Sequence, residues 1–235
     1  MTTHTLQQLC DTYLADYHSD TTPKTRYNME VFCRQLIQDL GDISLEDLTP
    51  DVIRQWLTTQ RQHLKSSTVH RKYARLSAIL RVAVEEYAWL SENPMKRIRK
   101  PSPGHSTVRF LSDEERRTLL AECRRSHNHL LYPFVLLALA TGGRKDELRT
   151  LRWGEVDTER GLVRFLRTKT HKARTVPLIG EALSVIKPLR QPAHLPSDLV
   201  FPGRCEGKPL FFGQAWRKAR ARAGITNSLT GKPLV

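Results

Sequence analysis

The feature that most constrains this chain is an apolar segment that ends abruptly in two glycines and a charged run. Residues 130–140 hold Leu, Phe, Val and Ala on all sides of a helix, which predicts a buried helix. Gly142 and Gly143 end it, because glycine adopts backbone angles that other residues avoid. Arg144 follows, and Glu147 lies three residues further on, so both side chains share one face of a new helix. The pattern favours an anion-binding site, with an ordinary surface ion pair at a helix start as the alternative.

The charge of the chain is strongly positive and unevenly distributed. The 235 residues carry a formal net charge of +14. Residues 61–110 hold 11 basic and 3 acidic side chains and residues 161–235 hold 14 and 3, whereas residues 1–60 hold 4 and 9. Two separate basic blocks favour a polyanion, DNA or RNA, that is contacted by two parts of the molecule. A generally basic surface that aids solubility is the alternative.

Several classes of protein are disfavoured by what the sequence lacks. The four cysteines form no Cys-x-x-Cys pair and the nine histidines form no His-Glu-x-x-His motif, so we expect no metal and no cofactor. The N-terminus lacks the basic and apolar regions of a signal peptide. The apolar runs are too short to cross a bilayer. We therefore expect a cytoplasmic protein that has no membrane partner.

The first part of the chain predicts a bundle of helices without strands. Apolar residues recur at helical spacing in residues 3–19, and further helices begin at Thr22-Pro23, at Thr49-Pro50 and after residues 66–68. We interpret residues 1–94 as an N-terminal helical domain. The fourth helix opens with hydroxyl residues and carries a basic cluster, which either faces DNA phosphates or is a solvated helix face. The candidate DNA contacts on it are Lys65, Ser66, Thr68, Arg71, Lys72 and Arg75.

A basic segment rich in proline and glycine comes next and predicts an interdomain linker over residues 95–108. Its cations Arg97, Arg99 and Lys100 are candidate contacts to a phosphate backbone. A second domain is predicted over residues 109–235, since its first helix opens with a capping box of Ser and Glu at residues 112 and 115.

The second domain combines helices with a β-hairpin. Residues 161–167 alternate apolar and basic side chains, and residues 174–178 form the returning strand after a turn. The hairpin carries cations that suit a phosphate backbone, among them Lys169, Lys172 and Arg174. Further helices are predicted over residues 180–189 and 214–223. The predicted fold class is therefore mainly α with a small β-hairpin or sheet: a helical bundle followed by an α+β domain.

The run from Ala140 to Asp157 resembles the first active-site box of the tyrosine recombinases, the phage integrase family. Gly143 departs from that pattern, since the family usually has an apolar residue before the arginine. Residues 168–178 are similar to the hairpin that carries the family's active-site lysine, and residues 66–94 resemble its core-binding, SAM-like domain. The positions that carry the first match are Thr141, Gly142, Arg144, Glu147, Leu148, Leu151, Trp153, Val156 and Asp157.

The resemblance implies a site-specific recombinase that cleaves and rejoins double-stranded DNA through a 3′-phosphotyrosyl intermediate, as integrases of mobile elements do. It implies that Arg144 binds the scissile phosphate and that Glu147 supports the site. It makes Lys169 the general acid, with Lys172 as the rival for that role. Self-association on DNA is expected of the full-length protein.

Two parts of the family pattern have no counterpart in these residues. No His-x-x-Arg follows Arg222, and the last tyrosine is Tyr132, ahead of the Arg144 box. We therefore expect a chain cut off before its last catalytic boxes, which binds DNA and does not cleave it alone. One alternative is a catalytically inactive, integrase-derived module that regulates recombination. Another is an unrelated basic helical DNA-binding protein, such as a repressor, in which Arg144 and Lys169 do not converge.

Overall fold

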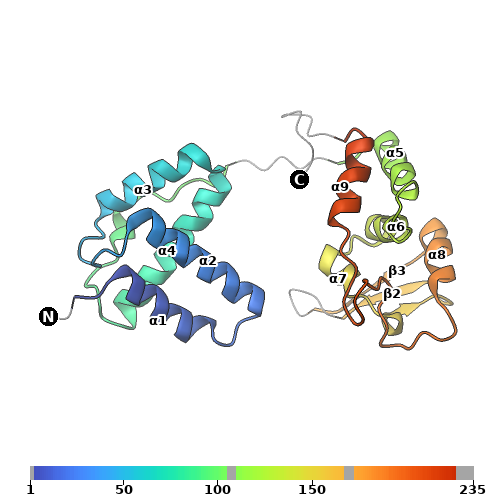
Figure 1. Ribbon diagram of the computed structural model, residues 1–235, viewed down its shortest axis with the longest axis horizontal. Coiled ribbons are helices and arrows are strands. Elements are labelled where there is room, and N and C mark those ends of the chain that lie inside the picture. Colours follow the sequence, from blue (N-terminus) through green and yellow to red (C-terminus); the bar gives the residue numbers. More distant parts are fainter. Residues whose placement is uncertain (1–2, 105–109, 167–171, 226–235) are drawn as a thin grey trace. The chain divides into compact units, whose positions relative to one another are not determined.

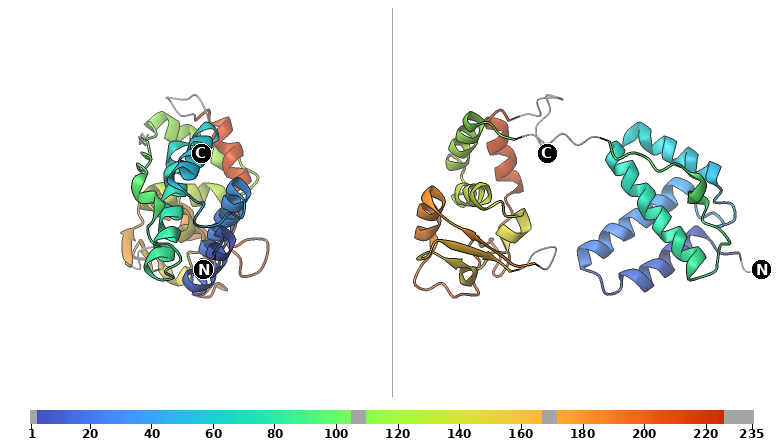
Figure 2. Two further views of the ribbon diagram at one scale, coloured as in Figure 1. Left: turned by 90° about the vertical axis from the view of Figure 1, so that its left-hand side faces the viewer. Right: turned by 180° about the vertical axis from the view of Figure 1, so that it is seen from behind.

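The chain folds into two compact units (Figure 1, Figure 2). The computed structural model describes residues 3–104, 110–166 and 172–225. Unit 1 spans Met1–Thr107 and unit 2 spans Val108–Val235. Each unit has a hydrophobic core of its own, as expected of a separate domain.

Unit 1 is built from helices, and the sequence predicted where several of them begin and end. The hydroxyl groups of Thr22 and Thr49 accept hydrogen bonds from backbone N–H groups of the first turn, and a proline follows each of them. Gly41 ends the second helix with φ of 78°. The predicted helical bundle is therefore confirmed. Its elements are α1 (Leu6–His18), α2 (Pro23–Leu40), α3 (Pro50–His63), α4 (Ser66–Glu85) and the short 3-10 helix η1 (Pro94–Arg97).

The longest helix, α4, forms much of the core of unit 1. Its side chains of Leu76, Ile79 and Leu80 are fully buried. Leu9 of α1 and Ile53 of α3 are fully buried in the same cluster. Burial of such side chains stabilises a fold by about 1.5–3 kcal/mol each, so α4, which packs against α1 and α3, contributes much of the stability of this unit.

The segment after α4 is packed against that helix, unlike an open linker. Met95 and Ile98 are buried in the core of unit 1. The Tyr73 hydroxyl donates to the Ile98 carbonyl over 3.0 Å, and His70 Nδ1 lies 2.6 Å from the Pro101 carbonyl oxygen. Residues 95–104 of the predicted linker are therefore part of the packed unit. Residues 105–108 lie outside the described residues, and a linker there stays a prediction.

Unit 2 follows the predicted order of helix, buried helix, hairpin and helices. The capping box at the start of its first helix is present, with both reciprocal hydrogen bonds. The helix predicted over 180–189 is an α-helix that continues as a 3-10 turn. The elements are α5 (Asp113–Arg124), α6 (Leu131–Thr141), α7 (Lys145–Arg149), η2 (Trp153–Glu155), β1 (Val156–Asp157), β2 (Leu162–Phe165), β3 (Arg174–Pro177), α8 (Gly180–Ile186), η3 (Lys187–Leu189) and α9 (Gly213–Arg222).

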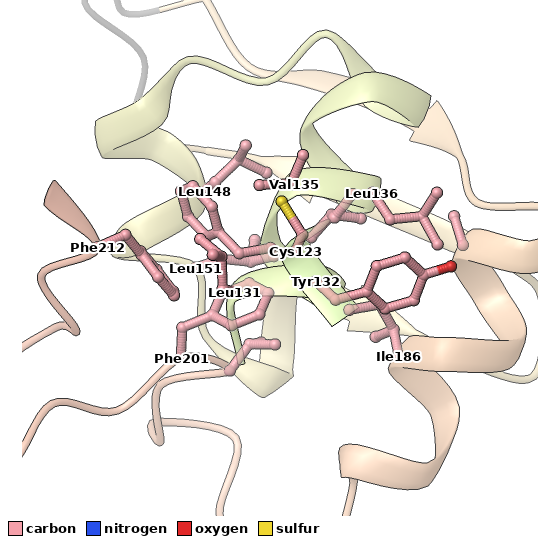
Figure 3. Packing of buried hydrophobic residues seen from close by; sticks show 14 of the residues in the cluster. Cys123, Leu131, Tyr132, Val135, Leu136, Leu148, Leu151, Ile186, Phe201 and Phe212 are labelled. Carbon is pink, nitrogen blue, oxygen red and sulfur yellow. The ribbon is translucent and has the colours of Figure 1, made fainter. Parts of the chain in front are cut away.

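Helix α6 is the centre of the unit 2 core, as its apolar sequence predicted. Leu131 and Leu137 of this helix are fully buried. Figure 3 shows Leu131 and Val135 among side chains from other parts of the chain, including Phe201 and Phe212. The rings of Phe134 and Phe212 stack with centroids 4.1 Å apart. A helix enclosed in this way holds the residues that follow it in a fixed place.

The hairpin of unit 2 belongs to a three-stranded antiparallel sheet in the order β1-β2-β3. Val163 pairs with Val176, and Phe165 pairs with Arg174. Along β2 the side chains of Val163 and Phe165 are buried and that of Arg164 is exposed, which is the alternation of a strand with one wet face. The hairpin prediction is confirmed. Strand β1, only two residues long, was not predicted.

Candidate active site and nucleic-acid interface

The two glycines after α6 allow the chain to turn and present Arg144. Gly142 has φ of 60° in the left-handed region and donates its N–H to the Ala138 carbonyl, which caps α6. A Cβ added to Gly143 would lie 2.9 Å from side-chain carbons of Leu148 and 3.0 Å from Phe165. Space is therefore absent for the apolar side chain that the family usually has here, because two core side chains already fill it.

Glu147 is the buried centre of the site, with a side chain only 5% exposed. Its carboxylate accepts the backbone N–H of Arg144 over 3.0 Å and the Nη1 of the same residue over 2.9 Å. It also accepts Nη2 of Arg174 over 2.6 Å and Nη1 of that residue over 3.3 Å. One carboxylate thus binds two guanidinium groups, one at the start of α7 and one from β3.

These contacts keep Glu147 ionised. The hydrogen bond from Arg174 is the largest influence and, with the bonds from Arg144, lowers the pKa of the carboxyl from 4.5 to about 2, against the opposing effect of burial. The same contact raises the pKa of the Arg174 guanidinium. The carboxylate is therefore a permanent anion at neutral pH, and it holds both arginines in place.

An open hollow of about 450 Å³ lies beside this cluster and is lined by Gly142, Arg144, Lys172, Ala173 and Arg174. The Arg144 side chain remains 55% exposed and that of Arg174 33% exposed. Arg174 also packs over the Phe165 ring, with 4.5 Å between guanidinium carbon and ring centroid. Three cations and one neighbouring carboxylate leave this hollow with a net positive charge, which suits an anion such as a phosphodiester.

The structure brings together some of the predicted site residues of unit 2. Arg144, Glu147 and Arg174 meet directly, and Lys172 lines the same hollow. Lys169 lies outside the described residues, so its predicted role as the general acid is untested. Sequence reasoning placed Arg174 only among the DNA contacts and missed its bond to Glu147. The alternation along the hairpin was the available signal, but it does not identify a partner 27 residues away.

The predicted contacts of α4 fall into two groups. Lys65, Ser66 and Arg71 are exposed at the N-terminal end of the helix, and Thr68 is partly exposed there. Arg75 is partly buried and lies over the Phe32 ring at 5.5 Å. The first group has the side chains most available to a phosphate backbone.

Lys72 is held by protein groups. Its side chain is 14% exposed, and its ammonium donates to Gln60 Oε1 over 2.6 Å. Gln60 and Trp56 both donate to the Asp39 carboxylate, at 3.0 and 2.9 Å, and Lys72 lies 3.8 Å from that carboxylate. The cluster ties α2, α3 and α4 together. We therefore assign Lys72 a structural role, while its predicted contact with DNA remains untested.

Arg97, Arg99 and Lys100 are all exposed on the segment packed along α4. Arg97 is 70% exposed and its Nε lies 3.5 Å from a carboxylate oxygen of Glu92, a pair that contributes little in water. Within the described ranges, no group of three or more His, Cys, Asp or Glu residues is placed to hold a metal ion. Among those residues, too, no helix is both long and apolar enough to span a membrane.

Comparison with known sequences identifies the family of the chain. Residues 109–234 match the phage integrase family, and residues 5–60 match the N-terminal SAM-like domain of phage integrases. The first match covers more than half of the sequence, so the chain belongs to the phage integrase family.

Individual relatives agree with this assignment. The shufflon-specific DNA recombinase of Escherichia coli is 33% identical over 199 residues, which cover 84% of this chain and 47% of that protein. The integrase of Haemophilus phage HP1 is 34% identical over 122 residues, which cover 52% of this chain and 36% of that protein. The chain spans about half the length of the curated relatives it matches.

Solved structures share the fold. A lambda integrase dimer bound to a COC′ core site matches with a TM-score of 0.79 at 22% identity, over 96% of this chain and 65% of that one. A Tn1549 transposon integrase in complex with a circular intermediate DNA also matches with a TM-score of 0.79, at 16% identity, over 100% of this chain and 82% of that one. The helical N-terminal unit and the second unit with its small sheet are therefore an integrase fold.

Proposed function

We propose that this chain is the DNA-binding part of a site-specific tyrosine recombinase, and that Arg144 binds a phosphodiester of the DNA. The observation that carries the proposal is the cluster in which Arg144 and Arg174 share the buried Glu147 carboxylate beside an open, cationic hollow. A guanidinium held in this way is preorganised for an anion and loses little freedom on binding. An exposed ion pair without the buried carboxylate has no such constraint.

The chemistry of the family gives this cluster a role. In the cleavage step, a tyrosine hydroxyl attacks the phosphorus, and negative charge builds on the oxygens that are not bridging. Arg144 is suited to neutralise that charge, because its planar guanidinium offers paired donors and stays protonated. Glu147 is suited to hold Arg144 in position. Lys169 remains our candidate for the acid that protonates the leaving 5′ oxygen, with Lys172 as its rival.

The partner that fits best is double-stranded DNA. The lambda integrase structures that share this fold contain a dimer on a core site and a tetramer on a Holliday junction. Two basic blocks, at residues 61–110 and 161–235, fall in different units of this chain, apart from residues 108–110 of the first block. We infer that both units contact the duplex and that the full-length protein self-associates on it. Binding through many phosphates makes affinity fall steeply with salt.

A polypeptide of these 235 residues is expected to bind DNA without cleaving it. It contains no tyrosine after Tyr132, and Tyr132 is 8% exposed and hydrogen-bonded to Arg124 and Glu181. That hydroxyl is thus occupied within unit 2 and is unsuited to attack DNA.

Fluorescence anisotropy with a labelled duplex, measured across a salt series, tests the proposal. We expect binding whose logarithmic affinity falls linearly with the logarithm of salt concentration, and a slope smaller by about 1 for Arg144→Ala. A suicide substrate with a nick should yield no covalent adduct. Absence of duplex binding at low salt, or an Arg144→Ala variant with unchanged slope, would refute the assignment. A covalent adduct would refute the inactivity of this polypeptide.

A further inference from the structure

Residues 93–104 of unit 1 form what we call the basic strap, which runs back along α4. Asn93 Nδ2 donates to the Ser77 carbonyl over 3.2 Å, just past the middle of the helix. A Cβ added to Gly104 would lie 3.5 Å from Cβ of Ser66, at the first residue of the helix. The basic strap therefore lies antiparallel to α4 and returns the chain to the N-terminal end of that helix.

Two side chains of α4 hold the middle of the strap. The Tyr73 hydroxyl lies 3.0 Å from the Ile98 carbonyl oxygen and 3.3 Å from that of Met95. His70 Nδ1 lies 2.6 Å from the Pro101 carbonyl oxygen. A carbonyl only accepts, so Nδ1 of this histidine carries the proton and donates it. Positions 66, 70, 73 and 77 are spaced by three or four residues and thus form one stripe of the helix.

The hydrogen bond of His70 is placed between two groups of exposed cations. Arg71 follows His70 on the helix, and Lys65 lies five residues before His70, at the N-cap of the helix; Arg99 and Lys100 directly precede Pro101 on the strap. The bond therefore fixes the lateral distance between the cations of the helix and those of the strap. Up to Ile98 the strap is also held by buried Met95 and Ile98, by the Tyr73 hydroxyl and by a hydrogen bond from Arg54 to the Arg97 carbonyl. Beyond Ile98, the bond from His70 acts together with the burial of Pro101.

We propose that His70 is a positioning residue for DNA binding, which locks the basic strap against α4 so that both sets of cations meet one phosphate backbone. The inference deepens the proposed function and rests on it for the identity of the partner. The lock, by which we mean the hydrogen bond from His70 to the Pro101 carbonyl, is present in the free protein. Prepositioned cations bind a polyanion with less loss of conformational entropy than cations on a loose segment.

The first test measures duplex binding by anisotropy across a salt series. His70→Ala should weaken binding roughly five- to tenfold and lower the salt slope by about 1, as for one or two lost phosphate contacts. His70→Asn should restore most of the affinity, since its amide nitrogen sits near the position of Nδ1. His4→Ala is the matched control: it removes a ring of the same unit that stacks on Trp89 at 3.9 Å, outside the basic strap, and should leave the slope unchanged.

A variant that lacks the cations of the strap shows whether His70 acts by positioning these cations or by stabilising unit 1 in general. In a chain with Arg97, Arg99 and Lys100 all changed to Ala, the further change His70→Ala should alter affinity less than twofold. An equal loss in both backgrounds would overturn the proposal, because His70 would then act elsewhere than through the strap. Unchanged binding by His70→Ala in the otherwise natural sequence would overturn it too.

Limited trypsin digestion measures, in the absence of DNA, how firmly the basic strap is held against α4. Cleavage after Arg97 and Arg99, identified by mass spectrometry, should be several-fold faster in His70→Ala than in the natural sequence and close to normal in His70→Asn. Unchanged cleavage in His70→Ala would show that the histidine does not hold the strap. If the natural chain fails to bind duplex DNA while His70→Ala still speeds cleavage, the proposed function fails and the lock stands.

Discussion

Glu147→Gln is the most informative single change in unit 2, because it keeps the shape of the side chain and removes the charge that both arginines share. In the folded chain the pKa of Glu147 is lowered from 4.5 to about 2. One pKa unit corresponds to about 1.4 kcal/mol, so the ionised carboxylate stabilises the fold by at most about 3 kcal/mol. The arginine side chains are 55% and 33% exposed, and solvent screens such pairs. We therefore expect a loss of about 1–2 kcal/mol in the free energy of unfolding at pH 7.

The pH dependence of this loss has a definite sign. A carboxyl whose pKa is lowered by folding contributes stability that is fully present above its unfolded pKa, near 4.5, and is lost as the pH falls toward 2. The difference between the natural chain and Glu147→Gln should therefore be constant from pH 5.5 to 7.5 and should shrink steadily below pH 4.5. The same variant should weaken duplex binding, because Arg144 loses the carboxylate that holds it.

Urea unfolding followed by circular dichroism at a series of pH values measures both effects. Glu206→Gln, at an exposed glutamate of the same unit, is the matched control and should change stability by less than about 0.5 kcal/mol. A Glu147→Gln variant as stable as the natural chain at pH 7 would refute the shared-carboxylate account. So would a difference that persists unchanged at pH 3.

Two further predictions concern the packing around Gly143 in unit 2 and the cations Lys72 and Arg71 of α4 in unit 1. Gly143→Val should destabilise unit 2 by about 1–3 kcal/mol, since its Cβ would lie 2.9 Å from side-chain carbons of Leu148; an unchanged urea midpoint would contradict this. Lys72→Met should lower the stability of unit 1 by about 1 kcal/mol through its lost hydrogen bond and leave the salt slope of duplex binding unchanged. Arg71→Ala should leave stability unchanged and lower that slope by about 1; the reverse pattern would show that Lys72 is the one that contacts DNA.

Local signals in the sequence predicted most helices of the fold. Hydroxyl caps followed by proline marked the starts of α2 and α3, and glycines marked the ends of α2 and α6, because these residues act on the backbone directly. The basic strap, in contrast, carries no local signal that predicts packing, and its sequence predicted a linker. Its anchors Met95 and Ile98 stand singly among Lys, Arg and Pro and form too short a pattern to predict a packed element, and they are buried because the segment lies against both α3 and α4.

The candidate site was only partly accessible to the same reasoning. The pair of Arg144 and Glu147 follows from helical spacing, whereas the bond from Arg174 depends on how the hairpin is oriented against α7. That orientation is set by tertiary packing of the sheet. Lys72 illustrates the converse limit: a lysine in a basic cluster suggests a surface cation, and only its hydrogen bond to the buried Gln60, next to the Asp39 carboxylate, indicates its structural role.

The central claim is that the guanidinium of Arg144, held by Glu147, meets a phosphate of duplex DNA. ¹⁵N-edited NMR of the arginine Nε–H signals, with Arg144 assigned by the Arg144→Lys variant, tests it most directly during titration with a duplex. If Arg144 binds a phosphate, its signal shifts on addition of the duplex, and the shift reverses when salt releases the DNA. An Arg144 signal that stays in place while other arginine signals of the chain shift would contradict it.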